Sequence, residues 1–476
     1  MPIETESIRQ QGSGVLRGSI AALLVQRWLG PGAALGALLL TLPALGVGWV
    51  ADDHYQRWVL RQSPVYAGLR PPPADMFRFV DGNPRRTERM KEIGLVPWWT
   101  SPTMRVAFWR PLTVLTHVVD QKLWPGRPAI MHAHNLCWFG LLLLSVALLY
   151  RQILGRTVAA GLAIVLYAVD YTHAVPAAWL ANRSTLLAAL FGVLAIYAHD
   201  QWRRCGRRLA AVLGPLLLAM ALLSAEAGIA TVAYVLAYAL TLDRSTWQSK
   251  AATILPYVLV VFLWRTLWSW QGYGVAEFDY VYLDPAAHPF RFCGMVFLRA
   301  PILLLSQLAM PPAEAHVVLG PHGALWVCLA GLAVLLLLVF LLWSLLRSTA
   351  AARFWAIGMV LATIPCCATI PLTRHLMFIS IGAMGLLGQY LAMALGGGRW
   401  PNVSLLRRLV EGMLVGLLLL VHLLLAPLGL LLLSRYPVGP SQFLASLHAI
   451  PCTTALHGSQ DLIIVNHPLP GVVLSC

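Results

Sequence analysis

The sequence predicts an all-α polytopic membrane protein with about eleven transmembrane helices, extracytoplasmic loops and a short C-terminal tail. The first observation is composition: 59% of the 476 residues are hydrophobic, 11% are charged, and the mean hydropathy is +0.71. A soluble globular chain is about 45–50% apolar and about 25% charged, so a water-soluble fold is excluded. The second observation is a series of apolar stretches long enough to cross a bilayer, and the third is the placement of basic clusters between them.

The apolar stretches define the expected helices in chain order. A helix rises about 1.5 Å per residue, so about 20 apolar residues cross the hydrocarbon core. The first stretch, "PGAALGALLLTLPALGVGWV", has this length and carries no charge. The same criterion gives spans at 31–50, 134–150, 157–178, 184–199, 209–224, 226–241, 252–270, 322–346, 354–371, 376–395 and 409–433.

Basic residues predict the orientation of these helices. Arg17 and Arg27 precede the first span, Arg151 and Arg156 follow the second, and the cluster "QWRRCGRR" (201–208) follows the fourth. Further basic residues follow the sixth, eighth and tenth spans, so that all of them fall on one side. Cytoplasmic loops carry such an excess of Lys and Arg. We therefore expect a cytoplasmic N-terminus and an extracytoplasmic C-terminus, and the Leu-, Ala- and Arg-rich composition favours a bacterial inner membrane.

The predicted organisation is one transmembrane domain, residues 1–433, followed by an extracytoplasmic tail, residues 434–476. Two long segments of the membrane domain also face outward, 51–130 and 271–321. The stretch "GMVFLRAPILLLSQLAMPP" (294–312) in the second segment is moderately apolar but is interrupted by Arg and Pro. Counting it as a span would break the charge alternation, so it is predicted to lie at the membrane surface.

Charge and cysteine usage exclude two classes of partner. The net charge of +15 does not indicate a nucleic-acid ligand, because the basic residues form short clusters between apolar spans. None of the eight cysteines has metal-ligand spacing. Cys452 and Cys476 lie in the tail, where "DLIIVNHPLPGVVLSC" predicts one or two short strands, and they can pair if the tail is extracytoplasmic. The first apolar run is too long for a cleaved signal and is predicted to be an anchor.

Two adjacent carboxylates follow the first span directly, in "WVADDHYQRW" (49–58). A charge at the membrane interface avoids most of the cost of a charge at the bilayer centre, so the simplest interpretation of Asp52 and Asp53 is a solvated helix end. Successive residues of a helix point about 100° apart. One carboxylate can therefore face the bundle while the other faces the loop or water, which permits a division of labour.

Further polar residues lie near the outer ends of the next spans. His132 and Asn135 are three apart and share a helix face, although a His there is more often a packing or capping residue. Trp179 and Arg183 are four apart and can stack. Asp170, together with His173, can form a simple intramembrane pair, and Glu226 can be an ordinary acid at a helix end. His134 is expected to be structural.

Several motifs together resemble the multi-span glycosyltransferases of the GT-C fold. They are the acidic pair, "RPLTVLTHVVD", His-x-x-Asn, "AAWLANRSTLLAALF" and "LLSAEAGIATVAYVLAYAL", and the nearest resemblance is to protein O-mannosyltransferases with tetratricopeptide repeats and their bacterial relatives. The family motif Phe-x-x-His-Pro-x-x-x-Glu-x-x-x-Trp-x-x-x-Arg is matched at Tyr167, Trp179 and Arg183. This sequence departs from the family pattern at Asp170, Tyr171 and Val175, and Ser-Lys-Glu reads Ser224, Ala225, Glu226.

The resemblance implies transfer of a sugar from a polyprenyl-phosphate carrier to an acceptor on the outer face, with inversion. It implies that Asp52 or Asp53 is the general base, which accepts the acceptor's proton as the new bond forms. An Arg fork suits the phosphate leaving group, and Arg183 is the preferred candidate, since Arg110 and Arg374 can also be interfacial side chains that reach lipid headgroups. The residues expected to bind substrate are Arg110, His132, Asn135, Asp170, Trp179, Arg183, Glu226 and Arg374.

The expected partners are membrane lipid, the lipid-linked sugar and a glycan, protein or lipid acceptor, with no nucleic acid and no cofactor. Adjacent carboxylates suit Mg²⁺ or Mn²⁺, but no further oxygen donors cluster near them, so no metal is predicted. Two alternatives stay open. A membrane transporter or flippase is disfavoured because the sequence shows no pair of matched halves. A catalytically inactive relative is compatible with the departures from the family motifs.

Overall fold

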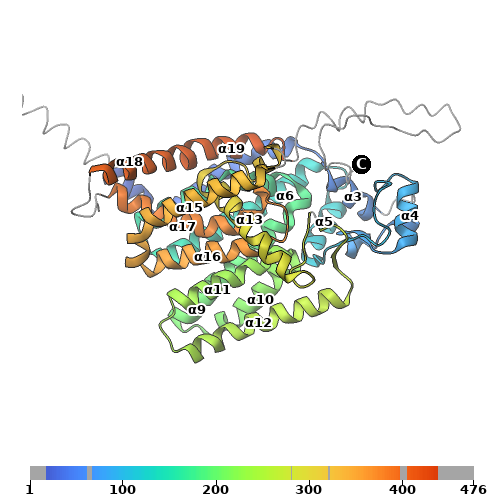
Figure 1. Ribbon diagram of the computed structural model, residues 1–476, viewed down its shortest axis with the longest axis horizontal. Coiled ribbons are helices and arrows are strands. Elements are labelled where there is room, and N and C mark those ends of the chain that lie inside the picture. The colour runs from blue at the N-terminus through green and yellow to red at the C-terminus, as the bar shows by residue number, and fades with distance from the viewer. Residues whose placement is uncertain (1–17, 62–66, 280, 320–321, 397–404, 438–476) are drawn as a thin grey trace, which may run out of the picture.

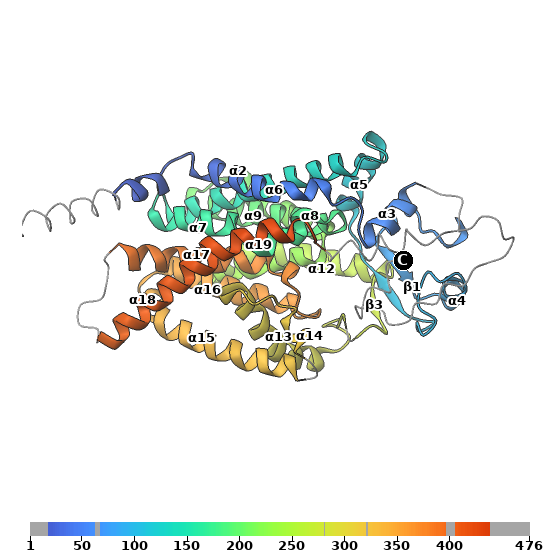
Figure 2. The same cartoon turned by 90° about the horizontal axis from the view of Figure 1, so that it is seen from above.

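The computed structural model describes residues 18–61, 67–279, 281–319, 322–396 and 405–437, with side chains omitted at 405–408. Most of these residues form helices that run roughly along the long axis of the molecule, and a smaller part with α4 and three strands projects from one end (Figures 1 and 2). The expected all-α membrane architecture is confirmed. The predicted tail strands and the two tail cysteines lie outside the described residues.

Among the described residues, eight helical segments are long and apolar enough to span a membrane, or nine if one bent pair counts as a single span. The bent pair is α7 (Val158–Ala168) with Tyr171–Ala178, which includes α8 (Ala174–Ala178), and the bend is 42°. The eight segments are Leu29–Gly46 (α2, Leu29–Thr41, with one 3-10 turn), α6 (Pro128–Leu154), Leu180–Cys205 (mostly α9, Arg183–Cys205), α12 (Trp247–Trp270), α13 (Pro289–Ala309), α15 (Gly323–Ser348), α17 (Met377–Leu395) and Leu409–Leu433 (α18, Leu405–Leu419, a π-helical turn and α19, Ala426–Leu433).

The predicted number of eleven spans is not confirmed. Three of the predicted spans correspond to apolar helices that are shorter than the others: α10 (Arg208–Ser224), Glu226–Thr241 with α11 (Ala230–Thr241), and α16 (Ala350–Cys366). At 16 or 17 residues they lie at or just below the short end of the range for a membrane crossing, which is about 17–25 residues. Every predicted span nevertheless corresponds to helix in the structure.

Helix α13 differs from the expectation of a separate surface helix. It is 21 residues long, meets the length and hydropathy criteria for a span, and packs on α15, α16 and α17. Arg299, which the sequence analysis took as an interruption, is buried and donates a hydrogen bond to the carbonyl oxygen of Cys367 at 3.0 Å. Because a neighbouring chain segment satisfies this cation, the Arg does not keep the helix out of the bundle.

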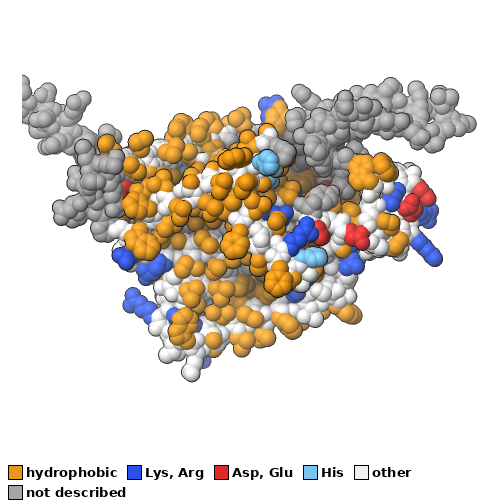
Figure 3. Space-filling model, in the orientation of Figure 1, with side chains coloured by type: hydrophobic (Ala, Val, Ile, Leu, Met, Phe, Trp, Pro, Cys, Tyr) orange, Lys and Arg blue, Asp and Glu red, His pale blue; other side chains and the backbone are white. Residues whose placement is uncertain are grey.

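Helix α17 is largely enclosed by the bundle, and small residues let its neighbours approach. A side chain at Gly382 or Gly385 would meet Trp355 of α16 at 2.5–2.6 Å, and one at Gly388 would meet Ala163 of α7 at 2.7 Å. Close backbone approach at small residues is the usual way in which membrane helices pack, because lipid supplies no hydrophobic driving force between them. The face of the bundle seen in Figure 3 carries many hydrophobic side chains.

The two long segments that the sequence predicts to face outward both contribute strands to one small unit beside the bundle, which we call the extramembrane unit. Strands β1 (Arg78–Asp81), β2 (Arg105–Ala107) and β3 (Gly274–Ala276) form an antiparallel sheet in the order β1-β2-β3, beside α4 (Pro84–Glu92). The first two strands come from the loop after the first span, and β3 follows α12. Val80, Met90, Val106 and Phe278 are buried together in its core. Helix α3 (Asp52–Leu60) lies where this unit meets the bundle (Figure 2).

Candidate functional site

The chain leaves its first membrane helix through a segment that two side chains from other parts of the chain hold in place. Gly48 has φ +77°, and its carbonyl oxygen lies 2.7 Å from Nε2 of His132. The indole N–H of Trp179 donates to the carbonyl oxygen of Val50 at 3.2 Å. Ala51, the residue before α3, has φ +47°, which is unusual for a residue with a Cβ. The position of the acidic pair is thus set by contacts from α6 and from the segment before α9.

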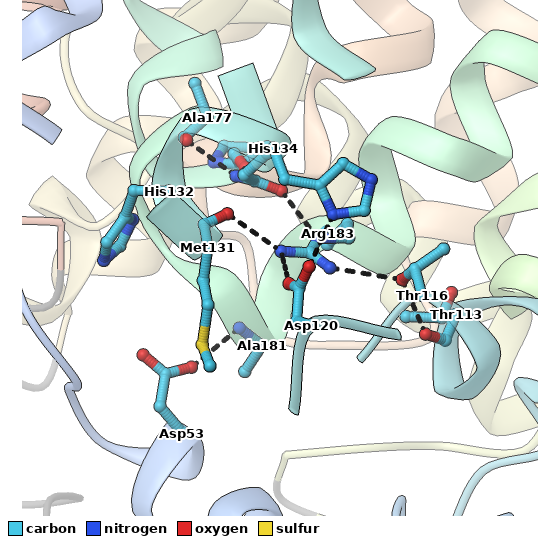
Figure 4. A network of polar contacts seen from close by, with 12 residues as sticks. Asp53, Thr113, Thr116, Asp120, Met131, His132, His134, Ala177, Ala181 and Arg183 are labelled. Carbon is cyan, nitrogen blue, oxygen red and sulfur yellow. Dashed lines mark hydrogen bonds and ion pairs between the residues drawn. The ribbon is translucent and has the colours of Figure 1, made fainter. Parts of the chain in front are cut away.

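Asp53 faces inward and is 3% exposed. Its carboxylate accepts the backbone N–H of Val50 at 3.0 Å and the backbone N–H of Ala181 at 2.7 Å. Burial raises the pKa of Asp53 to about 8, the two hydrogen bonds lower it in part, and the nearby Asp52 charge raises it further. Figure 4 shows this carboxylate beside Ala181, across from the arginine network described below. Asp53 therefore joins the start of α3 to the start of α9.

Asp52 lies in a different environment from its neighbour. Its side chain is half-buried, and no group in the described ranges donates a hydrogen bond to its carboxylate. Burial raises the pKa of Asp52 above its ordinary value, and attraction to Arg374 and Arg110 partly offsets that rise. The structure thus separates the pair, with Asp53 used in packing and Asp52 left accessible beside two cations.

Arg374 comes from a segment remote in sequence, the 3-10 turn Thr373–His375 that precedes α17. Its guanidinium lies 5.3 Å from the ring centroid of Trp179 and is half-buried. None of the acidic side chains that the structure describes forms an ion pair with it. The Trp179 ring was expected to stack with Arg183. The guanidinium of Arg374 lies over this ring instead, because the side chain of Arg183 points into the protein.

Arg110 is the second cation near Asp52 and is already paired. It precedes α5 (Pro111–Leu123), and its Nη2 and Nε lie 2.8 and 2.9 Å from one carboxylate oxygen of Glu226. The guanidinium also lies over the ring of Phe108 at 4.5 Å and reaches the hydroxyl of Ser184 at 3.5 Å. These contacts hold Arg110 rigidly, and Glu226 shares its charge.

Arg183 is fully buried, and groups of the protein engage its donors (Figure 4). Its Nη2 lies 2.6 Å from Oδ2 of Asp120 and 3.1 Å from the carbonyl oxygen of Met131, and its Nε donates to Asn135 at 3.1 Å. Asn135 also donates to the carbonyl oxygens of Pro176 and Ala177 at 3.1 and 2.7 Å. Asn135 and Arg183 therefore hold the bent segment before α9 together. The N–H groups of Arg183 face these protein groups and do not face a ligand at Asp52.

Asp170 is also buried, at the bend between α7 and α8. Its carboxylate accepts from Gln307 of α13 at 2.8 Å, from Ser380 of α17 at 2.5 Å and from the backbone N–H of Thr172 at 3.0 Å. His173 does not form the expected hydrogen-bonded pair with it; that ring packs against Tyr167 with centroids 4.5 Å apart. Val175, at a departure from the family motif, packs beside Val50 and Trp179.

Three important residues were not singled out from the sequence. Asp120 is 2% exposed and bridges Arg183 to Nδ1 of His134, at 2.6 Å to each. A signal for it existed, because a carboxylate among apolar residues next to a membrane span requires a cationic partner. Gln307 and Ser380 offered no such signal, since uncharged polar residues are common in membrane helices. His134, expected to be structural, has a structural contact.

The described residues contain no group of three or more His, Cys, Asp or Glu side chains placed to hold a metal ion. Asp52 and Asp53 face different surroundings, so they do not present their oxygens to one point. Glu226 uses one oxygen on Arg110. The donor set near the acidic pair therefore does not resemble the oxygen-rich shell that Mg²⁺ or Mn²⁺ requires.

No protein-family model and no curated protein matches the chain. Among solved structures the chain is similar to the oligosaccharyltransferase of Archaeoglobus fulgidus. The structure tethered to an acceptor peptide is 15% identical over 90% of this chain and 58% of that chain, with a TM-score of 0.43. The complex of AglB with an inhibitory peptide and a dolichol-phosphate is 12% identical over 88% and 57%, with a TM-score of 0.43.

The chain spans less than two thirds of the length of these enzymes. The apo form gives a similar result, with 14% identity over 89% of this chain and a TM-score of 0.44. At such low sequence identity and TM-score, the likeness carries no argument about chemistry. Any functional proposal must therefore rest on the chain's own side chains.

Proposed function

We propose that the protein is an integral membrane glycosyltransferase that moves a sugar from a polyprenyl-phosphate carrier to an acceptor outside the cytoplasm, with inversion at the sugar. The proposal combines a membrane fold with an acid–base and anion-binding pair at the edge of the bundle. The expected bacterial inner-membrane location, with the N-terminus in the cytoplasm, belongs to the same proposal. The nature of the acceptor (protein, glycan or lipid) is left open by the residues near Asp52.

The arrangement of Asp52 and Arg374 is the single observation that carries the proposal. They come from opposite ends of the chain, are both half-buried, and attract each other electrostatically. No ion pair joins them. Burial of a charge is costly unless the charge is paired, so folding alone would favour direct contact between the carboxylate of Asp52 and the guanidinium of Arg374. A carboxylate and a guanidinium held apart are suited to a substrate that carries a hydroxyl on one side and a phosphate on the other.

The chemistry assigned to the two groups balances. As the acceptor oxygen forms its bond to the sugar's anomeric carbon, its proton passes to the Asp52 carboxylate. The bond between the anomeric carbon and the phosphate oxygen breaks, and the polyprenyl phosphate leaves with the electron pair. The sugar passes through an oxocarbenium-like state. The Arg374 fork donates hydrogen bonds to the phosphate, whose negative charge grows during this step.

The other predicted site residues receive positioning roles in this proposal. Arg110, fixed by Glu226, adds positive potential near Asp52 without losing its own partner. His132, Trp179 and Asp53 hold the segment that presents Asp52. Three further residues, Asn135, Arg183 and Asp170, hold the helix ends around it. The phosphate role that the sequence suggested for Arg183 is given to Arg374 in this proposal, because Arg374 is half-buried and pairs with none of the acidic side chains in the described ranges.

The test compares Asp52→Asn with Asp53→Asn in membrane vesicles that contain the full chain. Vesicles receive a panel of radiolabelled undecaprenyl-phosphate hexoses and pentoses, and label leaving the lipid fraction is quantified. Asp52→Asn should lower transfer by about 100-fold or more, the typical contribution of a general base. Asp53→Asn should lower transfer much less than Asp52→Asn, because Asn keeps one oxygen that can accept a backbone N–H of the segment that presents Asp52; activity is divided by the amount of folded protein, measured by gel filtration in detergent.

Three outcomes would overturn the proposal. Full transfer by the Asp52→Asn variant at normal expression would remove the base assignment. Solute flux in proteoliposomes that lack any lipid-linked sugar, together with no transfer from any donor, would indicate a transporter. Absence of both activities in the folded wild-type protein would indicate an inactive relative, the alternative with which Val175 and Ala225 are compatible.

A further inference from the structure

Glu314 has a contact that neither the sequence motifs nor the proposed chemistry uses. It lies in the connection between α13 and α15, within "PPAEAH" (311–316). One carboxylate oxygen accepts the backbone N–H of Thr373 at 2.8 Å, and the other accepts the hydroxyl of the same residue at 2.5 Å. The hydroxyl oxygen of Thr373 in turn accepts the backbone N–H of Ala313 at 3.1 Å. Two connections far apart in sequence are therefore joined by three hydrogen bonds.

Thr373, which accepts and donates these hydrogen bonds, directly precedes Arg374. Thr373 begins the 3-10 turn that carries Arg374, and a turn of three residues has little rigidity of its own. Glu314 forms no ion pair with Arg374. Its carboxylate thus acts on the backbone of the turn and leaves the guanidinium unpaired.

A second contact joins the two helices that adjoin these connections, α13 and α17. Asp170 accepts hydrogen bonds from Gln307, near the end of α13, and from Ser380, near the start of α17. This contact already docks the two helices on each other. Glu314 is therefore not needed to bring α13 and α17 together. Its hydrogen bonds act on the turn Thr373–His375, which carries Arg374.

We infer that Glu314 is a positioning residue that sets the guanidinium of Arg374 at the phosphate end of the proposed site. The inference rests on the proposed function and adds a determinant of how the donor phosphate is bound. Trp179 supports the guanidinium from its face, and Glu314 fixes the backbone from which the side chain extends. Without Glu314, Arg374 should sample orientations away from the phosphate and away from Asp52.

The test measures donor turnover and its pH profile in the full chain. Glu314→Ala should lower kcat/KM for the lipid-linked donor on the order of 100-fold, the cost of a small misplacement of a catalytic contact. Glu314→Gln keeps an oxygen that can accept the Thr373 N–H, so its loss should be several-fold smaller. The groups that face Asp52 are Arg374, Arg110 and Asp53. Displacing Arg374 removes an attraction, so the acidic limb of the profile should move to higher pH.

A double variant separates positioning from general destabilisation. Arg374→Gln alone should cause the larger loss, and adding Glu314→Ala to it should cost little more, because both changes remove one interaction. Additive losses would overturn the inference. So would an unchanged acidic limb in folded Glu314→Ala protein. If Glu314→Ala does not fold, Thr373→Val and Thr373→Ser provide the same comparison, with loss expected for Val and rescue by Ser.

Glu277 offers a matched control. It also accepts hydrogen bonds from hydroxyls, those of Ser101 and Thr103, but lies in the extramembrane unit next to β3. Glu277→Ala should leave the acidic limb in place. Binding of undecaprenyl phosphate alone distinguishes the two levels of proposal: weaker binding by Glu314→Ala supports this inference, and unaltered binding contradicts it. Full transfer by Asp52→Asn would instead contradict the proposed base.

Discussion

Asp52 and Asp53 show how adjacent identical residues acquire different properties. Asp53 is surrounded by backbone donors and is closed off, whereas Asp52 has no donor in the described chain and two arginines at longer range. The difference follows from helix geometry, which turns successive side chains about 100° apart. Burial raises the pKa of both carboxyl groups, so access distinguishes them: Asp52 can meet a substrate hydroxyl, whereas two backbone N–H groups occupy the oxygens of Asp53.

At this scale, Arg374→Gln should change the pH dependence of transfer. Attraction to Arg374 lowers the pKa of Asp52, and the base must be ionised to act. Removing the cation raises that pKa, so the acidic limb of kcat/KM should shift to higher pH, besides a loss in rate. A pH–rate profile of the residual activity checks this. A shift to lower pH would show that Arg374 does not act on Asp52.

Asp53 should make stability depend on pH. Burial raises its pKa to about 8, above the ordinary value of 3.8, so the folded state holds its proton more tightly than the unfolded state. Stability from this group is then fully present below the unfolded pKa and is lost as pH rises toward 8. Asp53→Asn should flatten the fall in thermal stability over this interval, measured in detergent. An equally steep fall in the variant would assign the dependence to another group.

At the scale of elements, the entry into α3 carries backbone strain next to Asp52. Ala51 has φ +47° and ψ −122°, a region that suits glycine. Such a conformation costs about 1–3 kcal/mol in a residue with a side chain. Contacts from His132, Trp179 and Asp53 maintain it.

Ala51→Gly should therefore raise the melting temperature of the protein, since the contacts around the strained residue stay intact. Differential scanning fluorimetry in detergent checks the direction, with Gly48→Ala as the converse change at φ +77°. The Gly48 variant should melt earlier. Equal melting of Ala51→Gly and wild type would indicate that the strain is relaxed in the protein in solution.

The elements also show where sequence reasoning succeeded and where it did not. Apolar length located every predicted span on a helix, because hydropathy is a property of a continuous segment. The same criterion missed the membership of α13 in the bundle, since its Arg299 is satisfied by Cys367, a residue far along the chain. Likewise β3 could not be paired with β2 from sequence, because eight α-helices, α5 to α12, separate the two strands.

At the scale of the whole molecule, close packing around α17 holds the bundle together. Its small residues lie against α16 and α7, where an added methyl group would collide with backbone and ring atoms. The Asp170, Gln307 and Ser380 contact then ties the bend of α7–α8 to α13 and α17. The site at the edge of the bundle therefore depends on the packing of helices that do not themselves reach it.

Gly382→Ala should be strongly destabilising. Its new Cβ would lie 2.5 Å from the carbonyl oxygen of Trp355 and 2.9 Å from the backbone nitrogen of Met359, and backbone atoms cannot turn aside. Overpacking typically costs about 1–3 kcal/mol. Gly36→Ala is the matched control, because nothing lies within 4 Å of a Cβ there. Comparable thermal stability of the two variants would show that α16 and α17 are not in close contact.

The sequence by itself determined the membrane class, the places of the helices and the position of an acidic pair at the end of the first one. It did so because hydropathy, charge and helical period are local properties of the chain. Only the tertiary structure decided that Asp53 faces inward and that Arg183 is paired with Asp120. It also decided that Arg374 lies over Trp179, whose indole bonds to Val50, two residues before Asp52. These contacts depend on which side chains, distant in sequence, lie next to each charged group. Tertiary packing sets that, and a buried charge needs a partner.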